Sequence, residues 1–379
     1  MKDEPKVSSG GRLYGVDLLK ILSMLMVVIL HILGQGGILS AVKPFSLRYE
    51  AAWLLEISAY CAVNCFALAS GYVMIDLKFK YHRIMSLWLQ VVFYAVLISV
   101  GFYFCLPGSL DLKFIIQSFF PVGFNRYWYF TAYFPTFFLI PFFNHLLHTL
   151  DHQKARRLII TLVLLLSVYP TLVKADLFVT KDGYSFLWIS ALYLIGAYCK
   201  KYAVGINRKA RYAVLLYLAA VGVTWLWQHG VPFLTFRISG QAKSFSINLV
   251  SYSSPTILLS AVALLIAFSK IQIQKPILQK SILLLSSLSF SVYLIHDHPM
   301  LWQYWFKNHF VSYASLSSFL LPLAVIGTAA VIFAVCSLID LIRHYLFKWC
   351  KVDQKCRSIL ERVSGLIKKA AAKFGLPHP

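Results

Sequence analysis

Apolar residues occur along this chain in long runs that are separated by short polar segments. Ten of these runs are long enough for a helix to cross a bilayer, once helix tilt is allowed for. The predicted spans cover residues 15–34, 51–75, 84–106, 127–147, 158–175, 185–199, 212–228, 252–269, 281–303 and 317–342. The pattern therefore predicts an all-α integral membrane protein, built as a bundle of about ten transmembrane helices.

Lys and Arg residues are distributed unequally over the segments between these runs. Alternate segments, counted from the N-terminal one, hold 26 of the 36 basic residues, whereas the opposite segments hold 9. The remaining one, Lys20, lies inside the first span. Because basic residues are enriched in cytoplasmic loops, both termini are predicted to be cytoplasmic. The net charge of +22 then reflects topology, and nucleic-acid binding is not expected.

The composition agrees with a membrane protein. Apolar residues make up 59% of the chain and charged residues 13%, about half the charged share of a typical soluble domain. The seven cysteines fall mostly in apolar runs and show no spacing typical of metal ligands. We therefore interpret them as small core residues and expect no metal site.

The last part of the chain differs from the rest, so we divide the chain into a membrane domain, residues 1–343, and a basic amphipathic cytoplasmic tail, residues 344–379. Apolar residues of the tail recur at helical spacing between Lys and Arg residues. Such a helix is typical of segments that lie on anionic lipid. The alternative is a basic tail that only enforces the topology.

The first span carries ionisable residues where lipid-facing side chains are expected. At 100° per residue, Asp17, Lys20 and His31 share one stripe of the predicted helix. Lys20 and His31 are then separated by about 16 Å along the helix axis. Lys or Arg at the bilayer centre costs roughly 2.5–3.5 kcal/mol on insertion scales, so such groups usually face a functional path. A Lys near a helix end that merely reaches the lipid headgroups is the alternative for Lys20.

The predicted topology brings polar groups from four segments to one depth. His31, His296, Glu56 and the Arg126/Trp128 pair all fall in the outer third of the bilayer. A histidine oriented by a carboxylate is the arrangement that a general base requires, and a histidine can also carry an acyl group itself. Each residue also has a simpler explanation, as a hydrogen-bonded packing residue or an interfacial side chain.

A second set of candidates lies at the cytoplasmic side. Ser70 and Gly71 end the second span, and the basic turn that follows contains Lys80 and Arg83. Clustered cations bind phosphate groups, so this turn and Lys20 are candidates for an anionic ligand. The alternatives are close helix packing at the small residues and a topology signal in the basic turn.

Five short motifs occur in order along the chain. They are Asp17-Leu-Leu-Lys20 followed by His31, Phe66-Ala-Leu-Ala-Ser70-Gly71-Tyr72, Lys80 with Arg83, Trp128-Tyr129, and Ser289-Phe290-Ser291-Val292-Tyr293-Leu294-Ile295-His296. Together they resemble the ten-helix membrane acyltransferases of acyltransferase family 3. The resemblance covers residues of about 12 to 343, which is nearly the whole chain.

The resemblance implies an enzyme that takes an acyl group from cytoplasmic acetyl-CoA. Phosphates of the acyl-CoA would be held near Lys20, Arg83 and Lys80, with Ser70 and Gly71 beside them. Our candidate catalytic residues are then His31 and His296, which lie in the matched motifs, and Glu56, which is chosen for its depth. Our candidate acceptor-side residues are Trp128 and Tyr293, which lie in the matched motifs, and Arg126, which is chosen for its depth.

The resemblance also implies the acceptor and the location. The acceptor would be a hydroxyl of a cell-surface or exported polysaccharide, or of its lipid-linked precursor, and the enzyme would lie in a bacterial plasma membrane among its lipids. Two positions depart from the family pattern. Lys20 replaces the more frequent Arg and so loses bidentate phosphate geometry. Asn64 stands where an Asp is frequent, so no acidic role is assigned to it.

Two other functions remain open from the sequence. A transporter or uptake module favours interrupted helices and paired half-repeats, for which Pro255 and Pro322 are the only hints. A transferase of another acyl group, such as succinyl, would use the same residues. The acyl group, the sugar, the oligomeric state and the role of His31 as base or acyl carrier are not determined by the sequence.

Overall fold

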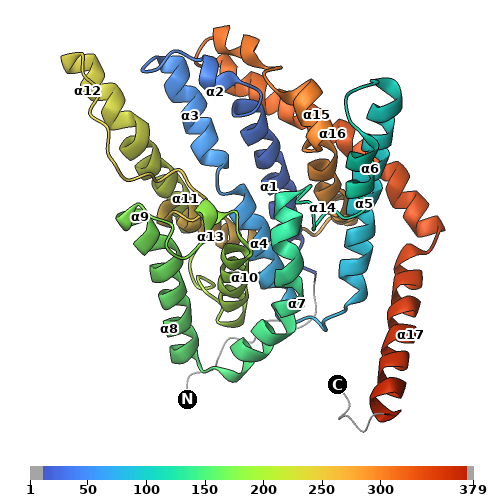
Figure 1. The fold of residues 1–379 in the computed structure, drawn as a ribbon. Helices are drawn as coiled ribbons and strands as arrows, with labels where there is room; N and C mark the ends of the chain where they lie inside the picture. Colours follow the sequence, from blue (N-terminus) through green and yellow to red (C-terminus); the bar gives the residue numbers. More distant parts are fainter. Residues whose placement is uncertain (1–11, 374–379) are drawn as a thin grey trace.

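The fold is seen in a computed structural model that describes residues 12–373, and this part of the chain is helical without any strand (Figure 1). The elements in chain order are α1 (Tyr14–Leu33), α2 (Ile38–Ala41), α3 (Leu47–Ala59), α4 (Ala62–Met74), α5 (His82–Cys105), α6 (Leu112–Ser118), α7 (Trp128–Thr149), α8 (His152–Val163), η1 (Leu164–Val168), α9 (Tyr169–Val173), η2 (Lys181–Gly183), α10 (Phe186–Lys201), α11 (Ala210–Trp225), η3 (Leu226–Gly230), α12 (Val231–Ser239), α13 (Pro255–Ser269), α14 (Pro276–His296), α15 (Pro299–Leu301), η4 (Trp302–Phe306), η5 (Val311–Ser315), α16 (Leu320–Trp349) and α17 (Val352–Lys373).

Each of the ten predicted apolar segments contains a helix. Within residues 12–373, eight helical segments are long and apolar enough to cross a membrane, and the shorter α10 and α13 account for the other two predicted spans. The prediction of an all-α membrane bundle is therefore confirmed. The count of ten spans and the cytoplasmic side of the termini stay predictions.

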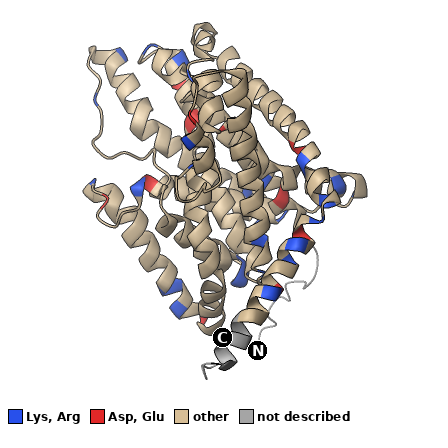
Figure 2. Ribbon diagram, turned by 45° about the vertical axis from the view of Figure 1, so that its right-hand side comes forward, with Lys and Arg blue, Asp and Glu red and all other residues tan. Residues whose placement is uncertain are grey.

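Charged residues lie mostly outside the apolar segments. Figure 2 shows most of the bundle in tan, with Lys, Arg, Asp and Glu mainly at helix ends, in loops and along the C-terminal helix, and only a few inside the bundle. A charge inside the bilayer core is costly, so this distribution is the one expected of helices that cross a membrane.

Two predicted spans are divided in the structure. The span predicted over 51–75 consists of α3 and α4, which meet at Tyr60 and Cys61. The span predicted over 281–303 is too long, because α14 ends at His296. His298 and Pro299 then begin a new short helix, and Pro299 has no backbone N–H with which to continue the old one.

Close helix packing occurs between α4 and α10. A Cβ atom added at Gly71 would lie 2.0 Å from the carbonyl oxygen of Tyr193, and one added at Gly196 would lie 2.0 Å from that of Leu68. Only glycine permits backbones to approach this closely. The two glycines therefore set the distance between α4 and α10, which packs α4 against the rest of the bundle.

A buried ion pair within α16 accepts a hydrogen bond from α5. Arg343 donates two hydrogen bonds to Asp340, with Nε–Oδ1 at 2.6 Å and Nη2–Oδ2 at 2.8 Å, and the Tyr94 hydroxyl donates to Asp340 Oδ1 at 2.6 Å. Asp340 is fully buried and Arg343 nearly so. Burial of charges is costly, so removal of one partner alone is strongly destabilising.

The C-terminal region folds as the amphipathic helix α17. Helix α16 continues to Trp349, beyond residue 343, and α17 begins at Val352. Asp353 of α17 accepts a hydrogen bond from Ser86 of α5, while Ile359, Val363 and Leu366 leave an apolar face exposed. This apolar face suits contact with lipid. Ile367 and Ala370 are among the residues whose side chains are not described, and Phe374 lies outside the described residues.

Candidate active site

Two histidines from α1 and α14 are in direct contact. Nδ1 of His31 and Nε2 of His296 lie 2.9 Å apart. The second ring nitrogen of His296, Nδ1, lies 2.5 Å from the carbonyl oxygen of Val292. His296 is buried, and the side chain of His31 is 16% exposed. The sequence placed these two residues at one depth, and the structure brings their rings together.

The end of α1 is held in place by the segment after η4. The backbone N–H of Asn308 donates to the Gln35 carbonyl at 2.9 Å, and that of Phe310 donates to the Gly36 carbonyl at 3.0 Å. Gly37 has φ = 87°, and an added Cβ would lie 2.7 Å from Oδ1 of Asn308. A glycine-rich turn is therefore needed for the chain to leave α1 against this segment, close to His31.

The carboxylate beside the histidine pair is Asp297. Its Oδ1 lies 3.7 Å from Nδ1 of His31, and Asp297 is buried. Glu56, the carboxylate that the sequence suggested, has no hydrogen bond or ion pair with His31 within residues 12–373. The carboxylate next to His31 therefore comes from the residue that follows His296. A catalytic role for Glu56 stays a prediction.

A small cavity of about 30 Å³ lies beside His31, with room for about one or two water-sized groups. Helices α1, α4, α7 and α14 line it, together with Tyr252 from the segment before α13. The lining residues are Met24, Val27, His31, Val63, Phe66, Trp128, Tyr129, Tyr252, Phe290 and Tyr293. Two of the expected acceptor-side residues, Trp128 and Tyr293, thus share the cavity with His31.

Arg126, the third expected acceptor-side residue, faces another element. It donates to Oε1 of Gln117 at 2.7 Å, and its guanidinium lies 3.6 Å from the ring centroid of Phe114. Both partners belong to α6, and Arg126 does not line the His31 cavity. The contacts brace α6 against the start of α7. An acceptor-side role for Arg126 stays a prediction.

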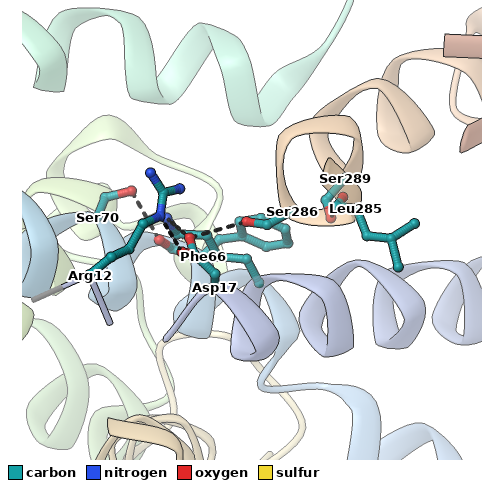
Figure 3. A network of polar contacts seen from close by, with 8 residues as sticks. Arg12, Asp17, Phe66, Ser70, Leu285, Ser286 and Ser289 are labelled. Carbon is teal, nitrogen blue, oxygen red and sulfur yellow. Dashed lines mark hydrogen bonds and ion pairs between the residues drawn. The ribbon is translucent and has the colours of Figure 1, made fainter. Parts of the chain in front are cut away.

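At the other end of α1, Asp17 is shared by several donors. Arg12 Nε lies 2.9 Å from Oδ2, Lys20 Nζ lies 3.4 Å from Oδ1, and the Ser286 hydroxyl of α14 donates to Oδ1 at 3.2 Å. Figure 3 shows Arg12 and Ser286 reaching Asp17. One carboxylate thus pairs with two cations, which leaves an excess of positive charge at this end.

A family comparison identifies the class of protein. The sequence model of a family described as the acyltransferase domain matches residues 13–341, nearly the whole chain. The chain belongs to this acyltransferase family. Searches of the curated proteins and of the solved structures found no match to the chain. The protein is therefore a membrane acyltransferase in general terms, and its family agrees with the one that the sequence motifs resemble.

In the acyltransferase, hydrogen bonding fixes the tautomers of the histidine pair. The Val292 carbonyl can only accept, so the proton of a neutral His296 lies on Nδ1 and its Nε2 carries a lone pair. That lone pair accepts a hydrogen bond from the Nδ1–H group of His31. Nε2 of His31 is then the unprotonated nitrogen, and it has no hydrogen-bond partner in the described part of the chain. This is the arrangement of a histidine poised as general base.

Serine and glycine at the end of α4 have structural partners. Ser70 donates to the Phe66 carbonyl at 3.1 Å, and Gly71 is the packing position against α10. Arg83 is exposed in the first turn of α5. The close approach of α10 supports the packing explanation for Gly71. A role of Ser70, Gly71 or Arg83 in donor binding stays a prediction.

The exposed Lys80 lines a groove of about 450 Å³ between the turn after α4 and α17. Arg357 and Glu361 of α17 line the same groove and form an ion pair with Nε–Oε1 at 2.8 Å. Lys20 and Arg83 do not line this groove, and Lys20 pairs instead with Asp17. The basic residues expected around a donor phosphate therefore do not all line one groove.

Asp297 is the residue at the histidine pair that the sequence reasoning missed. It directly follows His296. Glu56 was predicted because the topology placed it in the same outer third of the bilayer as His31. The signal that was available is Pro299, which ends α14 and allows the chain to turn at this point.

Proposed function

We propose that this acyltransferase is an O-acetyltransferase of the plasma membrane. It takes the acetyl group of cytoplasmic acetyl-CoA and transfers it to a hydroxyl of a cell-surface or exported polysaccharide, or of a lipid-linked precursor. The observation that carries the proposal is the hydrogen-bonded order Val292, His296, His31, which leaves a basic nitrogen on His31 in a membrane acyltransferase.

The chemistry follows from that nitrogen. Nε2 of His31 accepts the proton of the acceptor hydroxyl as the oxygen attacks the thioester carbonyl. The tetrahedral intermediate then collapses, the carbon–sulfur bond breaks, and the proton on His31 passes to the departing thiolate. The products are an ester and free CoA. Asp297, 3.7 Å from the ring of His31, stabilises the imidazolium formed between the two proton transfers.

The donor reaches this nitrogen along α1. Lys20 lies about 16 Å from His31 along the helix axis, which suits an extended donor arm with its phosphates at one end. Lys20 and Arg12 supply the positive charge there, with Lys80 and Arg83 on the turn after α4 as further phosphate partners. Both termini are then cytoplasmic, and a bacterial plasma membrane is the expected location.

The experiment uses the full-length protein in lipid nanodiscs with ¹⁴C-acetyl-CoA and de-O-acetylated envelope glycan from the cells that express it. His31→Ala is expected to lower transfer by about 10²- to 10⁴-fold, the usual contribution of a general base. The control is His145→Ala, an exposed histidine on α7, which should retain activity. Transfer by His31→Ala at the wild-type rate would show that His31 is not the base.

The same assay separates the other functions. Succinyl-CoA supplied in place of acetyl-CoA tests the alternative acyl group, and a faster rate with it would change the donor assignment. A transporter without transferase activity would yield no labelled glycan. Pro255 and Pro322, the sequence hints for interrupted helices, lie in the first turns of α13 and α16 and do not break either helix.

A further inference from the structure

Four aromatic rings form a cluster next to the His31 cavity. Tyr252 is central, with its ring centroid 4.9 Å from Tyr60, 5.0 Å from Tyr184 and 6.0 Å from Trp128. Trp128 and Tyr184 are 4.4 Å apart. The four rings come from the end of α3, the start of α7 and two loops, so the fold gathers them from distant parts of the sequence.

This aromatic cluster joins the surface to the cavity. Trp128 and Tyr252 line the cavity with His31, whereas Tyr184 is 44% exposed. A ligand that contacts Tyr184 from outside therefore lies against a continuous set of rings that ends beside the proposed base. Such rings offer flat apolar faces with phenol and indole groups at their edges.

Glu56 lies at the same cluster. Glu56 precedes Tyr60, the C-cap residue of α3, by four residues, so the two side chains share one face of the helix. Glu56 is 7% exposed, and its Oε2 is buried without a hydrogen-bond partner in the described residues. A buried polar atom without a partner is costly, and a hydroxyl donated by a ligand would satisfy it.

Carboxyl groups lie near the exposed ring. Burial raises the pKa of the Tyr184 phenol, and the nearby carboxylates of Glu56, Asp182 and Asp297 add to the rise. Ligand hydroxyl groups can donate hydrogen bonds to these carboxyl oxygens, whereas a ligand carboxylate or phosphate can only accept and gains no such bond.

We propose that Tyr60, Trp128, Tyr184, Tyr252 and Glu56 form the binding site for a neutral sugar ring of the acceptor. The sugar ring stacks its C–H face on the aromatic cluster, and one of its hydroxyl groups donates a hydrogen bond to Oε2 of Glu56. This inference rests on the proposed function, since it identifies the acceptor side of the same reaction. Glu56 then holds the acceptor, and the proton transfers belong to His31.

The test measures acceptor binding and transfer separately. The protein in nanodiscs is probed with maltoheptaose as a neutral ring sugar, oligogalacturonate as an acidic one and ribitol as a polyol without a ring. Binding is followed by saturation-transfer NMR in the absence of acyl-CoA. Transfer is followed by CoA release with de-O-acetylated envelope glycan as the acceptor.

Tyr184→Leu and Glu56→Leu are each expected to raise the KM for the glycan by about tenfold, with a change of kcat of less than about threefold. Saturation transfer to maltoheptaose should weaken in both variants. Tyr184→Phe, which keeps the ring, should restore most of the affinity. Tyr212→Leu is the control, because Tyr212 is 50% exposed on α11 and outside the cluster.

Three results would overturn the inference. They are an unchanged glycan KM in both variants, equal binding of ribitol or oligogalacturonate and the neutral ring sugar, and no binding of maltoheptaose by wild-type protein. Failure of the proposed function looks different. In that case sugar binding depends on Tyr184 and Glu56, yet wild-type protein releases no CoA and forms no ester.

Discussion

His296 is expected to act by orienting His31. His296→Ala removes the acceptor that lies 2.9 Å from Nδ1 of His31. His31 then loses the partner that fixes its tautomer, while its own ring and the cavity residues remain. His296→Gln keeps an acceptor oxygen near the position of the lost Nε2, although it cannot reproduce the bond to Val292 in the same geometry.

The size of the effect follows from burial. The side chain of His31 is only 16% exposed, so water replaces the lost acceptor poorly. A buried donor without a partner costs about 1–3 kcal/mol, which corresponds to about a 5- to 150-fold lower rate when the active tautomer is the one that loses stability. We therefore expect kcat for acetyl transfer to fall by that factor in His296→Ala. In His296→Gln it should stay within about fivefold of wild type.

The assay is initial-rate acetyl transfer in nanodiscs at saturating donor and glycan. Variants are first compared by thermal unfolding so that only folded protein is assayed. Selective ¹⁵N labelling of histidine then reports the protonated nitrogen of His31 in each variant. If His296→Gln is as slow as His296→Ala, or if the His31 tautomer is unchanged in His296→Ala, the orienting role of His296 is refuted.

Three further predictions concern donor binding and stability. Lys20→Ala should raise the KM for acetyl-CoA by about tenfold because a phosphate partner is lost, while Lys20→Arg keeps the charge and should leave the KM at or below the wild-type value. Equal KM values for the two variants would exclude a phosphate contact. Gly71→Ala should lower the free energy of unfolding by about 1–3 kcal/mol, since its Cβ would lie 2.0 Å from a backbone oxygen of α10. The control Gly222→Ala has open space and should be neutral or stabilising by up to about 1 kcal/mol, so similar unfolding midpoints for the two variants would contradict the packing geometry. Asp340→Asn should cost about 3–5 kcal/mol because the buried Arg343 loses its ion-pair partner, and an unchanged unfolding midpoint would show that the pair is not buried as described.

Much of the fold follows from the apolar runs, because a span must be apolar over its whole length. Each predicted run contains a helix, and the basic residues mark the segments between them. The break at Tyr60 and Cys61 was not predictable, because this part of the run contains neither proline nor glycine. The end of α14 at His296 carried a signal in Pro299, which the length of the apolar run outweighed.

For the candidate site, the sequence predicted the spacing of residues within a helix but not the distances between helices. Helical geometry gave the spacing of Lys20 and His31, and the depth of His296 brought it to the same layer. Distances between helices depend on packing, so the sequence could not choose between Glu56 and Asp297 as the carboxylate beside His31. Tyr184 and Tyr252 lie in loops, where no periodic pattern exists to indicate which side chains meet.

The proposed reaction is tested by one labelling measurement. Proteoliposomes that contain de-O-acetylated glycan inside receive ¹⁴C-acetyl-CoA outside, and label that becomes bound to the glycan is released with hydroxylamine, which cleaves esters. Wild-type protein is expected to form labelled ester on the enclosed glycan, and folded His31→Ala is expected to form at least about 100-fold less. Absence of labelled ester with wild-type protein, or equal label with His31→Ala, would contradict acetyl transfer across the membrane by His31.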